Sequence, residues 1–225
     1  MNPPVNRTLL RHELRRLLWN RVTLAQVLYT HAVILFVALT TALAEKTSDP
    51  GLWTSYTLFY GLGVALMFNN ISGGYLFVRP KMARAMDAVL VSPLSPGGYV
   101  ASSALACFIF NIVNFVLHMI LVLALRHPGL PGAGLVPASI AALSAGAMLL
   151  LALARFTLTS KEPGQGQIVM MLLTIGTLVA GSLTAAHLKP SAGYLWAVAA
   201  VSLAALSIAW RAAIGTLGRE EVVLS

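Results

Sequence analysis

The stretch "RPKMARAMDAVLVSPLSPGG", residues Arg79–Gly98, is the most polar internal segment of a strongly apolar chain. It contains two arginines, a lysine, an aspartate, three prolines and a glycine pair. A long apolar run precedes it and another follows it. If both runs cross a bilayer, this segment is a loop outside the membrane, and its charges and prolines predict that it has structure of its own.

The composition predicts a membrane protein. The chain has 225 residues, of which 58% are hydrophobic and only 10% are charged, and its mean hydropathy is +0.81. Soluble domains carry about a quarter charged residues. The net charge of +8 lies in short blocks between apolar runs, which is typical of a membrane topology and argues against nucleic acid as a partner. The single cysteine, Cys107, excludes a disulfide framework and a paired-thiol metal site.

Apolar runs long enough to cross a bilayer recur along the chain. About 20 helical residues span the hydrocarbon core of about 30 Å. Helices are expected because lipid cannot satisfy free backbone groups, and because these runs are longer and more uniformly apolar than barrel strands. We therefore predict an all-α integral membrane protein with a domain of six transmembrane helices over residues 22–214. The predicted spans are Val22–Ala44, Leu52–Val78, Tyr99–Leu125, Gly134–Phe156, Ile168–His187 and Gly193–Ile214.

The basic residues predict the orientation, because cytoplasmic loops of membrane proteins are enriched in lysine and arginine. One set of connections holds Arg7, Arg11, Arg15, Arg16, Arg21, Arg79, Lys81, Arg84, Arg155, Lys161, Arg211 and Arg219. The opposite set holds Lys46, Arg126 and Lys189. We therefore expect the N-terminus, the segment 79–98 and the C-terminal tail 215–225 to be cytoplasmic.

Residues 1–21, which include "NRTLLRHELRRLLWNR" (Asn6–Arg21), predict an amphipathic helix before the first span. At 100° per residue one face collects Leu10, Leu14, Leu17 and Leu18, and an adjoining face collects Arg7, Arg11 and Arg15. Trp19 stands where an interfacial aromatic residue is expected. The helix is suited to lie in the headgroup layer with its arginines toward anionic lipid. A basic anchor with no further role is the alternative.

Residues 80–92 predict a second amphipathic helix on the cytoplasmic side. One face of the helical wheel collects Met82, Met86, Val89 and Leu90, and the opposite face collects Lys81, Arg84 and Asp87. Pro80 suits a helix start, Ser92–Pro93 a helix end, and "SPGG" a turn into the third span. A short, stiffly held helix of this kind is suited to fit a groove on a soluble partner and to carry force to the two spans that it joins. The residues expected to make that contact are Lys81, Met82, Arg84, Met86, Asp87, Leu90, Ser92 and Pro93.

The pattern acidic-x-aliphatic-Leu-x-Ser-Pro-Leu, present as Asp87, Val89, Leu90, Ser92, Pro93 and Leu94, resembles the signature of ABC-2 type transporter permeases. The resemblance implies that residues 80–92 are a coupling helix, which docks on an ATP-binding subunit, and that residues 1–21 are the connecting helix. Many members have a glycine-threonine pair before the acidic residue, where this chain has Arg84 and Ala85. The run "MDAVLVSPLSPGGYVASS" is similar to drug or fluoroquinolone export permeases. The haem-exporter permease of cytochrome c maturation has a similar length and Ser-Pro segment and remains an alternative.

The sequence contains no motif for chemistry of its own. It lacks the GxxxxGK[ST] phosphate loop, and its nearest glycine-rich piece, "EPGQGQ" (Glu162–Gln167), has no lysine after the second glycine. It also lacks HExxH and a nucleophile elbow. We therefore expect no enzymatic activity and no cofactor or metal in this chain, with ATP and Mg²⁺ bound by a partner subunit.

Polar residues within the spans are candidates for function, because they are costly there. Asn69 lies in the second span, and Asn111, Asn114 and His118 form one stripe of the third span, which Cys107 continues. Two interpretations remain open for these residues. They form hydrogen bonds between helices, or they line a substrate pathway.

The favoured function is the permease subunit of an ABC exporter in the cytoplasmic membrane of a prokaryote. Its expected partners are two ATP-binding subunits, a second copy or a homologous permease, and membrane lipids. Few charges lie within the spans, which favours an amphiphilic cargo such as a drug, a lipid or a hydrophobic peptide. A membrane enzyme would need clustered Asp, His or Glu near an interface. A non-ABC channel or carrier usually needs an intramembrane carboxylate, and neither feature is present.

Overall fold

The structure, a computed structural model, describes residues 5–45, 50–84, 91, 93–124, 132–184 and 190–215. Throughout these ranges the chain forms helices and no strand, which confirms the prediction of an all-helical fold. The elements in order are α1 (Arg7–Trp19), α2 (Arg21–Glu45), α3 (Pro50–Gly73), the π-helical turn η1 (Gly74–Val78), α4 (Arg79–Met82), α6 (Pro96–Ala124), α7 (Gly132–Thr159), α8 (Pro163–Thr184) and α9 (Ala192–Gly215).

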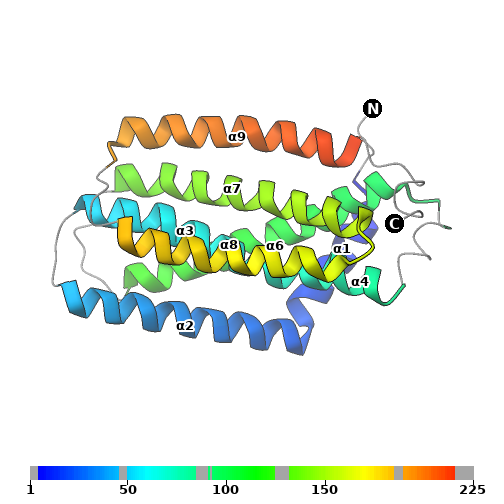
Figure 1. The fold of residues 1–225 in the computed structure, drawn as a ribbon, viewed down its shortest axis with the longest axis horizontal. Coiled ribbons are helices and arrows are strands. Elements are labelled where there is room, and N and C mark those ends of the chain that lie inside the picture. Colours follow the sequence, from blue (N-terminus) through cyan, green and yellow to red (C-terminus); the bar gives the residue numbers. More distant parts are fainter. Residues whose placement is uncertain are drawn as a thin grey trace.

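The long helices lie side by side in one bundle, and consecutive helices run in opposite directions (Figure 1). The short helices α1 and α4 lie at the same end of this bundle as the last turn of α9, on the right of the view (Figure 1). We call this end the α1 end. The segment between α4 and α6 therefore leaves the bundle at the α1 end and returns to it there.

Five of the described helical segments are long and apolar enough to cross a membrane, which indicates a multi-pass membrane protein. They are Gly61–Met82, Pro96–Ile120, Gly134–Thr159, Pro163–Ala180 and Ala192–Gly215. Helix α2, where the sequence predicts the first of six spans, is 25 residues long and lies alongside the bundle (Figure 1). It is not one of the five.

An asparagine begins each of the first two helices. The side-chain oxygen of Asn6 accepts a hydrogen bond from the Leu9 amide at 3.0 Å and so caps α1. Asn20 has an extended backbone with ψ of 122°, which ends α1. Its side-chain oxygen accepts from the amides of Val22 and Thr23 at 2.9 and 3.1 Å, which caps α2. The chain therefore turns from α1 into α2 at this one residue.

Prolines and serines begin the later helices. Helices α3, α6 and α8 each start with a proline, whose missing N–H costs nothing in the first turn. Ser95 precedes α6, and its hydroxyl accepts from the Gly98 amide at 3.0 Å. The Ser191 hydroxyl accepts from the Tyr194 amide at 3.2 Å at the start of α9. These residues are the local signals from which the ends of the apolar runs are read in the sequence.

Helix α3 continues without a break through η1 into α4. The π-helical turn begins at the second glycine of the pair Gly73–Gly74. A side chain added at Gly73 would meet Leu153 and Leu150 of α7 at 3.0 and 3.1 Å, and one added at Gly74 would meet Gln167 of α8 at 2.6 Å. The glycine pair therefore allows α7 and α8 to approach this part of α3 closely.

The start of the predicted helix over residues 80–92 falls in α4, which has Pro80 in its first turn. Helix α4 follows η1 directly, so it continues the line of α3. A proline is tolerated there because the preceding π-turn has already departed from the regular α-helical hydrogen-bond pattern. Helix α4 ends at Met82, and Arg84 has a φ of 54°, a left-handed conformation that turns the chain away from the helix axis. Residues 85–90 and 92 lie outside the described residues, so a helix there stays a prediction.

Helices α3 and α7 form the centre of the bundle. Helix α3 packs against α7, α8 and α6, while α9 packs on α7 and α1 packs on α6. The largest fully buried side chains include Phe68 of α3, Phe77 of η1, and Phe110 and Phe115 of α6. Phe68 and Phe110 meet edge to face, with ring centroids 6.5 Å apart. Since these core residues come from α3, η1 and α6, the segment between α4 and α6 is anchored at both ends to the packed interior.

Candidate functional site

A chain of buried polar groups joins three helices in the interior. Asn69 of α3 donates from Nδ2 to the carbonyl of Gly146 in α7 at 2.6 Å. Asn111 of α6 donates to the side-chain oxygen of Asn69, and the hydroxyl of Ser72 lies 3.2 Å from the side-chain oxygen of Asn111. We call Asn69, Ser72 and Asn111 the asparagine seam. Gly146 allows the close approach, because an added Cβ would lie 3.0 Å from Ala65 and 3.1 Å from the Asn69 amide nitrogen.

Two histidines lie beside each other in the same interior. The Nδ1 atoms of His31 in α2 and His118 in α6 are 3.4 Å apart, and the two rings stack with centroids 5.6 Å apart and 14° between their planes. The ring of Phe68 packs against His31 at 5.1 Å. Asn114 donates to the Phe110 carbonyl of its own helix at 2.8 Å. A neutral imidazole has one donor and one acceptor nitrogen, so one histidine can donate to the other.

The structure buries all four residues that the sequence singles out as a possible pathway, Asn69, Asn111, Asn114 and His118. It joins Asn69 to Asn111, while His118 pairs with His31 and Asn114 bonds its own helix. None of them lines any of the three cavities described below. Hydrogen bonds between membrane helices contribute roughly 0.6–2 kcal/mol each. In this conformation the seam therefore supports the interpretation that these residues hold the helices together.

His31 is a member of this cluster that the sequence does not single out. It lies 87 positions from His118, on a helix whose neighbours cannot be read from the sequence. A histidine within an apolar run was the available signal. Its Nε2 atom is buried and has no hydrogen-bond partner among the described residues. Within the same residues no group of three His, Cys, Asp or Glu side chains is placed to hold a metal ion.

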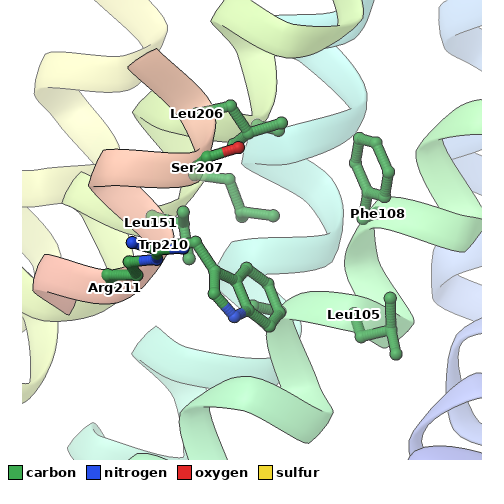
Figure 2. A pocket seen from close by; sticks show the side chains of 10 residues that line it. Leu105, Phe108, Leu151, Leu206, Ser207, Trp210 and Arg211 are labelled. Atoms are coloured by element: carbon green, nitrogen blue, oxygen red, sulfur yellow. The ribbon is translucent and has the colours of Figure 1, made fainter. Parts of the chain in front are cut away.

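An apolar cavity of about 360 Å³ lies between α6, α7 and α9 (Figure 2). Trp210 reaches from α9 toward α6, from which Phe108 and Leu105 face the same space (Figure 2). Its polar lining residues are Arg211 and Ser207, whose hydroxyl donates to the Leu203 carbonyl at 3.0 Å. The remaining lining residues are Ala104, Ala147, Leu150, Leu151 and Leu206. A concave apolar surface with one cation at its edge suits an amphiphilic molecule.

The described residues of the predicted coupling helix have different environments. Lys81 donates from Nζ to the Leu158 carbonyl in the last turn of α7 at 3.0 Å, so its ammonium group stabilises the end of that helix. Met82, Arg84 and Pro93 are exposed. The other four predicted contact residues, Met86, Asp87, Leu90 and Ser92, lie outside the described residues. The structure therefore places Lys81 in an internal contact and three others on the surface.

Two further cavities lie at the α1 end, and basic and aromatic side chains line both. They share His12, Arg16 and Tyr75, and one of them also includes Arg79. The sequence alone predicts no site at these residues. The signal that could have found it is the spacing of Tyr75 and Arg79, which are four residues apart and so lie on one face of a helix.

Comparison of the chain with protein-family models, with curated proteins and with solved structures gives no match.

Proposed function

We propose that this chain is the transmembrane permease subunit of an ATP-binding cassette exporter. It acts in the cytoplasmic membrane of a prokaryote, with α2 as the first of six spans. The observation that carries the proposal is the segment Asp87–Leu94, whose acidic-x-aliphatic-Leu-x-Ser-Pro-Leu pattern resembles that of ABC-2 permeases. The chain has no phosphate loop of its own, so a separate subunit supplies ATP hydrolysis.

The attachment of this segment supports a coupling role. On its N-terminal side the chain continues from the central helix α3 through η1 and α4, and on its C-terminal side α6 begins at Pro96. Lys81 adds a third attachment, through its 3.0 Å hydrogen bond to Leu158 of α7. A displacement of the segment would therefore act on α3, α6 and α7, the helices that the asparagine seam joins.

The distribution of charge supports a cytoplasmic position for the α1 end. Basic residues are concentrated at that end of the described helices, and cytoplasmic sides of membrane proteins carry this excess. They are Arg7, Arg11, Arg15, Arg16, Arg21, Arg79, Lys81, Arg84, Arg155, Lys161 and Arg211. The predicted coupling segment then faces the compartment that contains ATP.

The apolar cavity supports an amphiphilic cargo. Its aromatic and aliphatic walls suit a hydrocarbon or ring system, and Arg211 at its edge suits a polar or anionic group of the same molecule. Two copies of the chain, or this chain and a homologous permease, form the complete pathway, and two ATP-binding subunits dock on their coupling segments.

The test is purification of the chain in mild detergent from its native host, with identification of the proteins that accompany it. We expect a soluble protein with a phosphate loop and an ATPase activity that vanadate inhibits. A chain that purifies without such a protein and without ATPase activity would contradict the exporter function.

Charge reversal in the coupling segment is the sharper test. We expect Asp87→Arg and Arg84→Glu each to weaken binding of the ATP-binding subunit, because a charge-assisted contact contributes about 1.5–3 kcal/mol, or roughly tenfold to a hundredfold in affinity. Transport should fall with it, while membrane insertion is unchanged. Glu162→Arg is the control, since it reverses an exposed charge in the loop between α7 and α8. Normal binding and transport by both coupling variants would show that this segment does not couple the subunits.

A further inference from the structure

Two guanidinium groups stack over one tyrosine at the α1 end of the bundle. The guanidinium carbon of Arg16 in α1 lies 5.3 Å from the ring centroid of Tyr75, and that of Arg79 in α4 lies 5.5 Å from it. The hydroxyl of Tyr75 accepts a hydrogen bond from the Asn20 side chain at 2.7 Å. The turn between α1 and α2 therefore fixes the tyrosine, and the tyrosine holds both arginines.

The cluster has an excess of positive charge. Glu13, only 3% exposed, forms an ion pair with Arg16 at 3.0 Å and is, among the described residues, the one carboxylate that lines the two cavities here. The side chains of Arg15 and Arg79 form no hydrogen bond or ion pair with another residue of the described part of the chain. Arginine presents a planar fork of donors that matches phosphate oxygens, so this arrangement has capacity for an anion.

The space for that anion is adjacent. A cavity of about 490 Å³ is lined by Arg16, Tyr75 and Arg79 together with His12, and a neighbouring cavity of about 390 Å³ is lined by Arg15, Arg16 and Trp19. Both are open concave surfaces between α1 and the η1 turn. The donor groups of three arginines therefore face one continuous region of the α1 end.

The position of the cluster favours a lipid over a soluble anion. It lies where the apolar part of α3 ends, which is the depth of the phospholipid headgroups if α3 crosses the membrane. Trp19, 78% exposed, borders it as an interfacial aromatic residue does. The exposed apolar side chains of Leu18 and Val22 lie on either side of the turn between α1 and α2, and they are suited to contact acyl chains.

We propose that Arg16 and Arg79, held over Tyr75, bind the phosphate group of an anionic phospholipid in the leaflet at the α1 end. The occupied site joins α1 to α4 and so links the N-terminal helix to the start of the segment 79–98. It uses only these contacts and does not depend on the export function.

The experiment is native mass spectrometry of the full chain in detergent, titrated with phosphatidylglycerol or with phosphatidylcholine of the same acyl chains. We expect the wild-type chain to bind phosphatidylglycerol about tenfold more tightly, which corresponds to one charge-assisted contact. Arg79→Gln should abolish most of this preference. Arg11→Gln is the matched control, because it removes the same charge from an exposed position of α1 that lines neither cavity.

Three results would overturn the proposal. The first is an equal loss of affinity in Arg79→Gln and Arg11→Gln, which would indicate diffuse attraction to the basic end. The second concerns Arg79→Lys, which keeps the charge but not the planar fork of donors. We expect this variant to bind phosphatidylglycerol with intermediate affinity, and wild-type affinity would overturn the proposal. The third is displacement of the lipid by millimolar inorganic phosphate, which would identify a site for soluble phosphate. If Arg79→Gln does not fold, the affinity of Arg79→Lys for phosphatidylglycerol tests the proposed site instead.

Discussion

Asn69 is the residue on which the interior polar contacts depend most, because it bonds α6 and α7 from α3. We expect Asn69→Ala to lower the free energy of unfolding by about 1–3 kcal/mol, since it removes the bond to the Gly146 carbonyl and leaves the Asn111 amide buried without its acceptor. The measurement is the thermal unfolding midpoint of the purified chain in detergent.

Asn70 provides the matched control for that substitution. It is the next residue of α3, and its side-chain oxygen has no hydrogen-bond partner among the described residues. Asn70→Ala should leave the unfolding midpoint nearly unchanged. Equal destabilisation by both substitutions would show that the asparagine seam does not contribute specifically.

At the residue scale the sequence predicts which polar side chains share a helix face but not what they meet. The spacing of Asn111, Asn114 and His118 places all three on one stripe, and all three are buried. The partner of His118 in α2 and the stacking of Arg16 on Tyr75 involve helices far apart in the sequence. Such contacts depend on which helices are neighbours, and periodicity carries no information about that.

Helix α1 shows how packing selects one face of an amphipathic helix. The sequence predicts Leu17 and Leu18 on the same apolar face, but Leu17 is fully buried and Leu18 is 42% exposed. Glu13 is buried although it is charged, and its carboxylate forms an ion pair with Arg16. The Asn6 amide also donates to Ser102 of α6 at 2.9 Å. Only part of the apolar face of α1 is therefore in contact with the other helices.

The two leucines give a paired test of this docking. We expect Leu17→Ala to cost about 2–4 kcal/mol through the cavity it leaves, and Leu18→Ala to cost less than about 0.5 kcal/mol. Hydrogen–deuterium exchange over residues 7–19 should accelerate only in the first variant. Equal acceleration in both would indicate that α1 is held by the lipid surface and not by α6.

At the element scale, helix starts follow from single residues and can be read in the sequence, as at Pro96 after Ser95. The interruption at Arg84 could not be read in this way. The apolar run before Arg79 gives no sign of a π-helical turn, because the same residues are equally compatible with a regular α-helix. The sequence therefore gives no sign that α4, which has Pro80 in its first turn, continues directly from α3 through η1.

The orientation of the whole molecule can be tested with single cysteines. We expect a membrane-impermeant maleimide to label Tyr194→Cys in intact cells and Val91→Cys only in inverted vesicles, because these exposed residues lie at opposite ends of the bundle. The native Cys107 is fully buried and gives little background. Labelling of Val91→Cys in intact cells would reverse the proposed topology.

At the scale of the whole molecule, composition and run length predict an all-helical membrane protein, and the described residues agree. They do not predict that α3 and α7 are central while α8 and α9 are largely exposed. All of these helices are apolar on every side, so hydrophobicity alone cannot rank them by burial. The apolar cavity beside Trp210 was unpredictable for the same reason, since three helices form it.

The π-helical turn η1 has a consequence for how this chain tolerates insertions and deletions. A π-turn contains about one residue more than an α-turn, which is the structural trace that an inserted residue leaves in a helix. Removing one residue from 74–78 would restore regular helix and leave the residues beyond it in nearly their present orientation, whereas removing one residue from the regular part of α3 would rotate them by about 100°. Only the second deletion would take Lys81 away from the Leu158 carbonyl. The π-helical turn is thus the place in this long helix where the loss of a single residue disturbs the following segment least.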